Sequence, residues 1–353
     1  MKALIVDRHA EDLSRVQYTD VDMPVPRAGQ LLVRLSASVI NPADFNLIHG
    51  RNLHALQRAV WNFGKPGCYQ LPGGGPHKRA PCTLGTEGLG VVEAVGSGLL
   101  ARRYMGKRVA ILAADAPQSG TWAEYLAVDS NRALPLPKDI DDEQGAMFFL
   151  NPLAAYILTR ELLCVPRGAW LLQTAAGSAL GKMVIRLGRR FGFKTLNVVR
   201  RRERVAELRR LGGDVVIATE ADDLFTRVAE ETGGAGVHYA IDSVGGSLCG
   251  EVLRCLAPHG RLVCYGTQDP GSTQLPVRQL MLSLARVEGF YLGNWLAMQS
   301  KWKRDAVMRQ VRKLVATGEL SSRAEREFHL HDFEAALAYA RSGAGKALFR
   351  MVQ

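Results

Sequence analysis

The segment from residue 168 to residue 203 constrains the fold of this chain more than any other. It reads GAWLLQTAAGSALGKMVIRLGRRFGFKTLNVVRRRE. The short apolar runs at residues 170–173 and 195–199 are typical of buried parallel strands. Between them, Met183, Leu187 and Phe191 recur at helical spacing, and Gly192 is a typical helix stop. The order strand, tight turn, helix, strand predicts half of a dinucleotide-binding unit.

The turn in this segment departs from the G-x-G-x-x-G pattern of such units. Ala176 and Ser178 stand where the first two glycines belong, and only Gly181 keeps its place. The mostly small side chains of residues 175–181 would let backbone N–H groups and a helix N-terminus approach a pyrophosphate. Two interpretations stay open, a pyrophosphate-binding turn and an ordinary small-residue turn.

Three consecutive arginines follow the second predicted strand. A cofactor with a free ribose 2′-hydroxyl calls for Asp or Glu at this place, but the chain has Val199 and then Arg200, Arg201 and Arg202. Guanidinium groups bind a 2′-phosphate, which a carboxylate would repel. We therefore predict NADPH as the cofactor. The alternative is a solvated basic helix start, which the helix dipole disfavours.

Length and composition indicate an ordinary globular protein of about two domains. The 353 residues are 47% hydrophobic and 22% charged, and no apolar run reaches the roughly 18 residues of a membrane span. The net charge of +11 comes from scattered basic residues without an aromatic-interleaved RNA motif. It favours an anionic cofactor and substrate over nucleic acid. Six cysteines without a C-x-x-C pair, and a strand-like start at residues 1–7, predict structural thiols and a cytoplasmic location.

The strand and helix patterns divide the chain into a β-rich part and an alternating part. Residues 1–140 contain β-branched runs at 31–35, 90–95, 108–112 and 123–128, which predict a barrel-like domain. Residues 141–289 alternate helices and buried strands, which predicts a doubly wound parallel sheet in an α/β fold. Residues 290–353 end in a strand-like run expected to rejoin the first domain. The Gly- and Pro-rich segment 51–82 is either a lid or a surface loop.

Several ordered blocks now resemble one known family. They are VINPAD (39–44), GTEGLG (85–90), GKRV (106–109), GTWAEY (120–125), NPLAAY (151–156) and DSVGG (242–246). With the nucleotide turn, they resemble the medium-chain dehydrogenase/reductase superfamily over nearly the whole chain. Within it, the chain most resembles the mitochondrial-type trans-2-enoyl-thioester reductases, next to the quinone oxidoreductases, through NPADFN (41–46), Asn151 with Pro152, TLNVVR (195–200) and GFYLGNW (289–295).

This resemblance implies a GroES-like catalytic domain, a Rossmann nucleotide-binding domain and a homodimer formed near residues 275–290. It also implies that the catalytic zinc of related alcohol dehydrogenases is missing. Zinc needs thiolate, imidazole or carboxylate donors, but Asn41 stands in the place of the ligand Cys and Thr86 in that of the ligand His. His49, His54 and His77 have no spacing that fits a metal site. We therefore predict a zinc-free member.

Without zinc, the implied reaction is reduction of an activated C=C bond with NADPH. The substrate would be a 2-enoyl thioester; a quinone or small enone is the alternative. A third hypothesis is a catalytically silent NADPH-binding protein whose basic surface recruits RNA or a partner protein.

Two residues are candidates for catalysis. The resemblance makes Tyr69, in the G-x-Y element after an inserted segment, the proton donor; it could equally be an ordinary loop aromatic. Asn41 would bond the substrate carbonyl or the nicotinamide ribose, or would simply form a turn before Pro42. Asp44 and Glu87 are expected to anchor loops.

The resemblance also assigns residues to the cofactor. Four lie in the pyrophosphate turn, two at the 2′-phosphate and the rest toward the nicotinamide, where Phe290 and Leu292 could instead be core residues. The residues are Ser178, Ala179, Leu180 and Gly181; Arg200 and Arg202; and Asn151, Val244, Gly245, Tyr265, Gly266, Thr267, Phe290 and Leu292.

Overall fold

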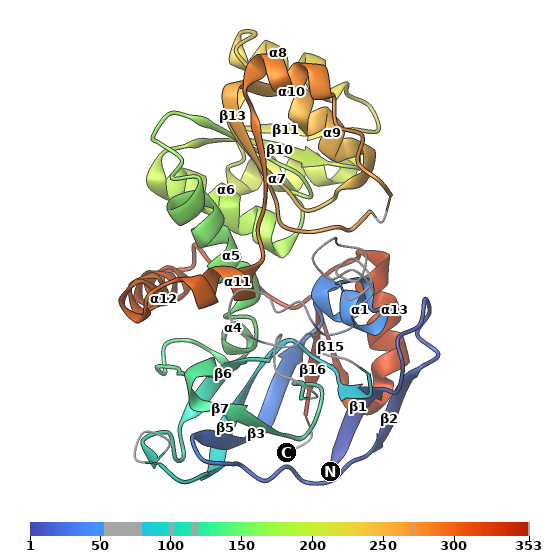
Figure 1. The fold of residues 1–353 in the computed structure, drawn as a ribbon, viewed down its shortest axis with the longest axis vertical. Coiled ribbons are helices and arrows are strands. Elements are labelled where there is room, and N and C mark those ends of the chain that lie inside the picture. The colour runs from blue at the N-terminus through green and yellow to red at the C-terminus, as the bar shows by residue number, and fades with distance from the viewer. Residues whose placement is uncertain (53–79, 99–101, 114–118, 270, 352–353) are drawn as a thin grey trace. The chain divides into compact units, whose positions relative to one another are not determined.

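A computed structural model describes residues 1–52, 80–98, 102–113, 119–269 and 271–351 of the chain (Figure 1). These residues form two compact units. The first comprises Met1–Leu150, Leu296–Ser300 and Ser322–Gln353, and the second comprises Asn151–Trp295 and Lys301–Ser321. The proposed proton donor Tyr69 and most of the segment 51–82 lie outside the described residues, as do His54 and His77.

The first unit is built on antiparallel strands around the long strand β3 (Gln30–Val39). Along β3 buried and half-buried residues alternate, so that Leu31, Val33 and Leu35 face the core. One sheet has the order β15-β16-β3-β5-β6-β8, with β7 also paired to β3, and a smaller sheet has the order β2-β1-β4. The other strands are β1 (Lys2–Val6), β2 (Val16–Asp20), β4 (Cys82–Thr83), β5 (Glu87–Val95), β6 (Arg108–Leu112), β7 (Tyr125–Asp129), β8 (Ala133–Pro135), β15 (Arg326–His329) and β16 (Ala347–Arg350).

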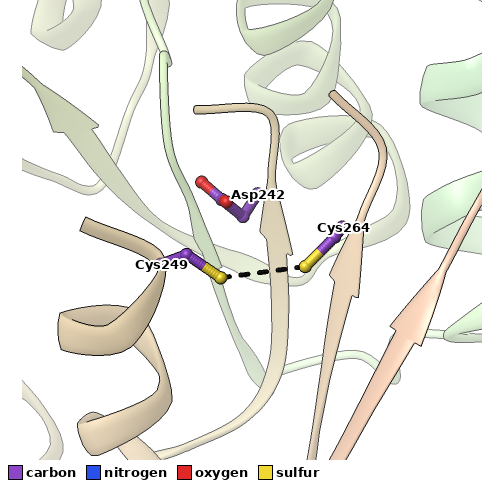
Figure 2. A group of neighbouring side chains, drawn as sticks. All are labelled: Asp242, Cys249 and Cys264. Atoms are coloured by element: carbon purple, nitrogen blue, oxygen red, sulfur yellow. Dashed lines mark hydrogen bonds between the residues drawn. The ribbon is translucent and has the colours of Figure 1, made fainter. Parts of the chain in front are cut away.

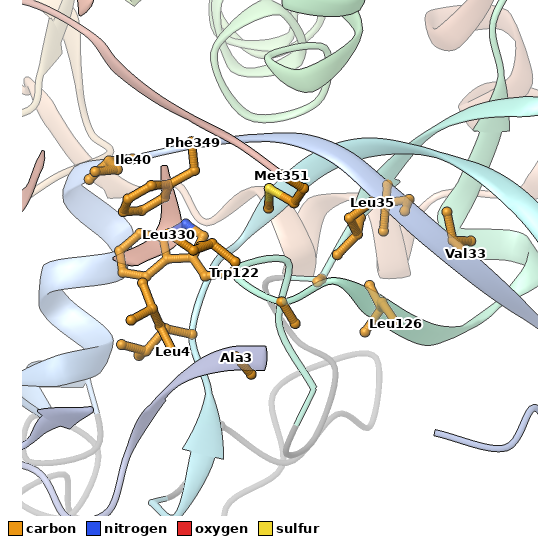
Figure 3. Close-up of a cluster of buried hydrophobic side chains, with 14 of the residues drawn as sticks. Ala3, Leu4, Val33, Leu35, Ile40, Trp122, Leu126, Leu330, Phe349 and Met351 are labelled. Carbon is orange, nitrogen blue, oxygen red and sulfur yellow. The ribbon is translucent and has the colours of Figure 1, made fainter. Parts of the chain in front are cut away.

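The core of the first unit joins both ends of the chain. Trp122 and Phe349 are fully buried and meet edge to face, with ring centroids 5.2 Å apart (Figure 3). Leu4 from β1 and Met351, just past β16, belong to the same cluster. The predicted return of the last strand to the first domain is confirmed, because β16 pairs with β3. The helices here are α1 (Pro42–Ile48), α4 (Asp142–Ala146) and α13 (Phe333–Ser342), with 3₁₀ turns at Ser130–Arg132 and Leu330–Asp332.

The second unit is a parallel sheet with the order β11-β10-β9-β12-β13-β14. The strands are β9 (Trp170–Gln173), β10 (Lys194–Val199), β11 (Val215–Ala218), β12 (Val237–Asp242), β13 (Leu256–Cys264) and β14 (Arg286–Gly289). The order reverses between β9 and β12, and ligands of doubly wound sheets bind in the crevice at such a point. The predicted dinucleotide-binding topology is therefore present.

Helices cover both faces of this parallel sheet. Val199 of β10 clusters with Ile185 of α6 and Leu208 of α7, whereas Val198, its neighbour in the chain, clusters with Val252 of α9 on the other face. Gly192 ends α6 in the left-handed conformation, at φ +80°, as its place in the sequence predicts. The helices are α5 (Leu150–Tyr156), α6 (Ala179–Phe191), α7 (Val205–Leu211), α8 (Leu224–Thr232), α9 (Gly246–Arg254), α10 (Val277–Ser283), α11 (Leu292–Met298) and α12 (Lys301–Ala316), with a π-helical segment at Ile157–Leu162 and a 3₁₀ turn at Arg202–Arg204.

The helix α12 belongs to the second unit, although we expected residues 290–353 with the first domain. Polar contacts explain the difference: Lys303 of α12 pairs with Glu161, and Arg186 of α6 donates a hydrogen bond of 2.8 Å to the carbonyl of Ser321. Among the residues that the structure describes, no helix combines the length and the apolar character needed to cross a membrane.

Candidate active site

The turn after β9 has the shape of an anion-binding helix N-terminus. Ser178 caps α6, and its hydroxyl accepts a hydrogen bond of 3.1 Å from the Gly181 amide. A Cβ atom on Gly181 would lie 2.5 Å from the carbonyl oxygen of Ala176, so only glycine fits there. The first turn of a helix leaves further amide groups without intrahelical acceptors, and here these belong to Ala179 and Leu180. The fit to a phosphate therefore survives the loss of two glycines.

The three arginines lie at the end of β10 with their side chains exposed. Val199 before them is buried, and the Arg202 amide donates a hydrogen bond of 2.7 Å to the Glu220 carboxylate, which fixes the start of the following turn. The side chains of Arg200 and Arg202 are thus available to an anion, but exposure equally fits a solvated helix start. Their role at a 2′-phosphate stays a prediction.

A second basic group beside the turn was missed in the sequence. The Cγ and Cδ atoms of Arg204 lie 3.8 Å from the place of a Cβ on Gly177. Its guanidinium contacts Glu207 at 3.0 Å, and the Lys182 ammonium contacts the same carboxylate at 2.6 Å. Burial alone would raise the pKa of Glu207, but the hydrogen bonds from these two cations lower it. The i,i+3 spacing of Arg204 and Glu207 was a signal for that ion pair, whereas Lys182 comes from the separate helix α6.

The Asp242 carboxylate organises the point where the strand order reverses. It is fully buried at the end of β12 and accepts a hydrogen bond of 2.5 Å from the Thr174 hydroxyl, just after β9. It also accepts hydrogen bonds from the amides of Val244, at 3.1 Å, and Gly245, at 2.9 Å. Gly245 adopts φ +79° and ψ −152°, a conformation that glycine alone adopts readily. Asp242 therefore sets the backbone of two residues predicted to bind the cofactor.

The other predicted cofactor residues differ in how well they fit that role. The Asn151 Nδ2 group is a buried donor with no acceptor in the described part of the chain, as expected of a group that bonds a ligand. Tyr265, followed by Gly266 and Thr267, comes directly after β13, and burial raises the pKa of its hydroxyl to about 12.

Phe290 and Leu292 have structural roles of their own. The Phe290 amide donates a hydrogen bond of 2.8 Å to the carbonyl of Cys264, so it is not free for the nicotinamide carboxamide. Leu292 is buried at the start of α11, as a core residue would be. A backbone hydrogen bond from Phe290 to the carboxamide would therefore have to use its carbonyl oxygen.

In the first unit, Asn41 lies at the centre of a buried polar network. The Asn41 Nδ2 group donates a hydrogen bond of 2.9 Å to the Glu87 carboxylate, and the Lys346 ammonium donates to Asn41 Oδ1. The second oxygen of Glu87 accepts hydrogen bonds of 2.9 Å from the amides of Phe149 and Leu150. The predicted anchoring role of Glu87 agrees with these bonds, whereas a substrate contact by Asn41 stays a prediction and would compete with them.

In this network, burial disfavours the charged forms of Glu87 and Lys346, and their partners oppose that effect. Burial raises the pKa of Glu87, and the Leu150 amide and the Lys346 charge oppose that rise. Burial likewise lowers the pKa of Lys346, which Glu87 opposes. Glu87 is 1% exposed, so its charge depends on these partners.

Comparison with known proteins shows which family this chain belongs to. Residues 27–138 match the alcohol dehydrogenase GroES-like domain, and residues 179–310 match the zinc-binding dehydrogenase domain. The mitochondrial enoyl-[acyl-carrier-protein] reductase of Caenorhabditis elegans is 30% identical over 333 residues, which cover 93% of this chain and 88% of that protein. The chain belongs to the medium-chain dehydrogenase/reductase superfamily.

Two further relatives support the same assignment. The mitochondrial enoyl-[acyl-carrier-protein] reductase of Xenopus tropicalis is 28% identical, covering 95% of this chain and 91% of its own. The Escherichia coli quinone oxidoreductase, solved in complex with NADPH, is 23% identical with a TM-score of 0.84 over the full length of both chains, which shows the shared fold. The predicted fold class, a GroES-like domain with a Rossmann domain, is confirmed.

Within the superfamily, this chain is of the zinc-free type. The residues in the place of the catalytic zinc do not fit that metal. Asn41 and Thr86 offer no thiolate or imidazole. The Glu87 carboxylate is already bonded to Asn41 and to two backbone amides, and the Lys346 ammonium beside Asn41 would repel a divalent cation. His49 instead makes a hydrogen bond of 2.8 Å with the carbonyl of Ala10.

Replacement of Lys346 by Met tests the buried network. The Glu87 charge would lose its counter-charge, and breaking a buried pair costs about 3 kcal/mol here, the low end of the usual range because Lys346 is only half-buried. Burial raises the pKa of Glu87 in the folded state. The loss of stability is therefore absent below the pKa of Glu87 in the unfolded chain, and it grows as pH rises through the pKa of Glu87 in the folded protein. Urea unfolding at about pH 5 and about pH 8 measures both the loss of stability and its dependence on pH.

The matched control is the double variant Lys346→Met with Glu87→Gln. It leaves no buried charge, so it should recover most of the lost stability and should not show the pH dependence of the single variant. Equal stability of Lys346→Met and the unchanged protein at both pH values would contradict the account.

Proposed function

We propose that this protein is an NADPH-dependent oxidoreductase that reduces the activated C=C bond of a 2-enoyl thioester. The observation that carries the proposal is the similarity, over nearly the whole chain, to proteins named enoyl-[acyl-carrier-protein] reductases. The capped turn before α6 and the arginines after β10 support the cofactor. A quinone or small enone as substrate is the second candidate, favoured by the fold shared with a quinone oxidoreductase.

The second unit supplies the cofactor site in this proposal. Residues 178–181 hold the pyrophosphate through their amides, and Arg200 and Arg202 hold the 2′-phosphate. Asp242 holds the Val244–Gly245 turn in place for the nicotinamide side. NADPH, when bound, supplies a hydride to the β-carbon of the substrate.

The remaining chemistry needs a donor for the enolate oxygen and a proton for the α-carbon. Tyr69 stays our proposed proton donor, on sequence grounds alone. Asn41 stays a candidate enolate donor. It would have to use the second N–H of its Nδ2 group, which lies 3.5 Å from the Thr86 hydroxyl oxygen. Lys346 and Glu87 hold that amide in a fixed orientation.

Replacement of Arg200 by Ala tests the cofactor choice. Loss of a charge-assisted hydrogen bond costs roughly 1.5–3 kcal/mol, so NADPH should bind about ten- to a hundredfold more weakly while NADH is nearly unaffected. Arg201→Ala is the matched control, because Arg201 is equally exposed and has no proposed contact. Fluorescence titration with both cofactors measures the effect. An equal loss for NADPH and NADH would argue against the 2′-phosphate role.

A panel of substrates tests the reaction. NADPH oxidation with crotonyl-CoA, a long-chain enoyl-CoA and quinones should be fastest with an enoyl thioester. Turnover of quinones alone would favour the second candidate. NADPH binding without oxidation by any acceptor, together with salt-sensitive RNA binding, would favour the silent binding protein instead.

We also propose a homodimer formed along β14, the edge strand of the parallel sheet. Met281, Leu282 and Leu284 beside it are 68%, 80% and 60% exposed, an apolar surface typical of an interface. Leu282→Glu should convert the dimer to a monomer in light scattering, whereas Val25→Glu, at an equally exposed apolar site in the first unit, should not. A monomeric unchanged protein would refute this proposal. The predicted cytoplasmic location stays a prediction, since the relatives above are named mitochondrial.

A further inference from the structure

Three potential metal ligands meet where α9 faces the ends of β12 and β13. The Sγ atoms of Cys249 and Cys264 lie 3.8 Å apart, and the Asp242 carboxylate lies beside them (Figure 2). One ligand atom from each residue lies within 4.8 Å of the others. Asp242 and Cys249 are buried, and Cys264 is half-buried. The residues come from three elements of the second unit, so the fold rather than a local sequence motif assembles the cluster.

The separation of the two sulfur atoms fits a shared metal better than a disulfide. Two thiolates on one tetrahedral zinc, each at about 2.3 Å, are about 3.8 Å apart. A disulfide has an S–S distance of about 2.05 Å, so the two sulfur atoms, 3.8 Å apart, are not bonded here. The two thiols share a hydrogen bond, and that bond lowers the pKa of Cys249 while raising that of Cys264.

We propose that Cys249, Cys264 and Asp242 form a binding site for a thiophilic divalent cation such as Zn²⁺ or Cd²⁺. Two sulfur ligands select such cations over Mg²⁺ or Ca²⁺, and water fills the fourth position. Binding turns both thiols into thiolates and releases their protons, so that two thiolates and one carboxylate surround the cation. The site is separate in the chain from Asn41 and Thr86, which stand where the superfamily's catalytic zinc ligands would be.

The cation competes with the cofactor turn for Asp242. The carboxylate already accepts hydrogen bonds from Thr174, Val244 and Gly245, so coordination weakens its hold on that turn. Cys264 also directly precedes Tyr265, which is predicted to lie on the nicotinamide side. Metal binding should therefore lower the affinity for NADPH and inhibit the enzyme; this coupling rests on the proposed function, whereas the site itself does not.

Titration of the reduced, full-length protein with Cd²⁺ tests the site without any cofactor. We expect a thiolate-to-metal charge-transfer absorption that saturates at one cation per chain, with proton release measured by calorimetry in two buffers. Cys249→Ser and Cys264→Ser should each weaken binding by more than the roughly 10- to 100-fold that loss of an outer-shell partner costs. Cys164→Ser, which removes an exposed thiol elsewhere, is the matched control and should bind as the unchanged protein does.

Circular dichroism and thermal unfolding check that the variants fold, and Cys264→Ala gives a second variant at the more exposed position. Absence of the absorption band, or unchanged binding in the doubly substituted protein, would overturn the site. So would formation of a Cys249–Cys264 disulfide under mild peroxide with no Cd²⁺ binding before oxidation. A repeat of the NADPH titration with Cd²⁺ present then tests the coupling, and an unchanged NADPH affinity with the site filled would overturn that part.

Discussion

The nucleotide-binding unit depends on one buried carboxylate. Asp242 ends β12 beside β9, where the strand order reverses, and its hydrogen bond from Thr174 ties these two strands together. Burying a charge is costly unless donors replace the lost water, and the hydroxyl and two backbone amides do so here. The same bonds that stabilise the charge also fix the turn at Val244 and Gly245. The stability of the sheet and the conformation of this turn therefore rest on the same side chain.

The first unit handles a buried charge in a different way. Glu87 is neutralised by a cation of the chain itself, since Lys346 reaches it through the Asn41 amide. An ammonium group cannot coordinate an alcohol or lower the pKa of a bound water as zinc does. The loss of the zinc ligands, at Asn41 and Thr86, thus goes together with the presence of a cation of the chain, Lys346. That change agrees with the proposed reduction of a C=C bond rather than with alcohol oxidation.

The sequence predicted best those features that depend on local patterns. The strand at 170–173, the helix stop at Gly192 and the return of the last strand to the first domain all follow from short-range periodicity, and the structure contains each of them. Features that depend on distant partners were missed. Lys182 and Arg204 are brought together by their shared partner Glu207. Asn41 bonds Lys346, which is 305 positions away in the chain. No local pattern around Cys249 predicts its contact with Cys264.

The pairing of β16 with β3 has a consequence for synthesis of the chain. Residues 1–150 are translated before the second unit, yet their central strand and the ring of Trp122 wait for Phe349 to complete the sheet and the core. All of the second unit is made in between. Contacts so far apart along the chain slow folding and leave apolar surface exposed until they form. Of the two units, the one whose translation begins earlier is therefore the one whose sheet and core are completed later.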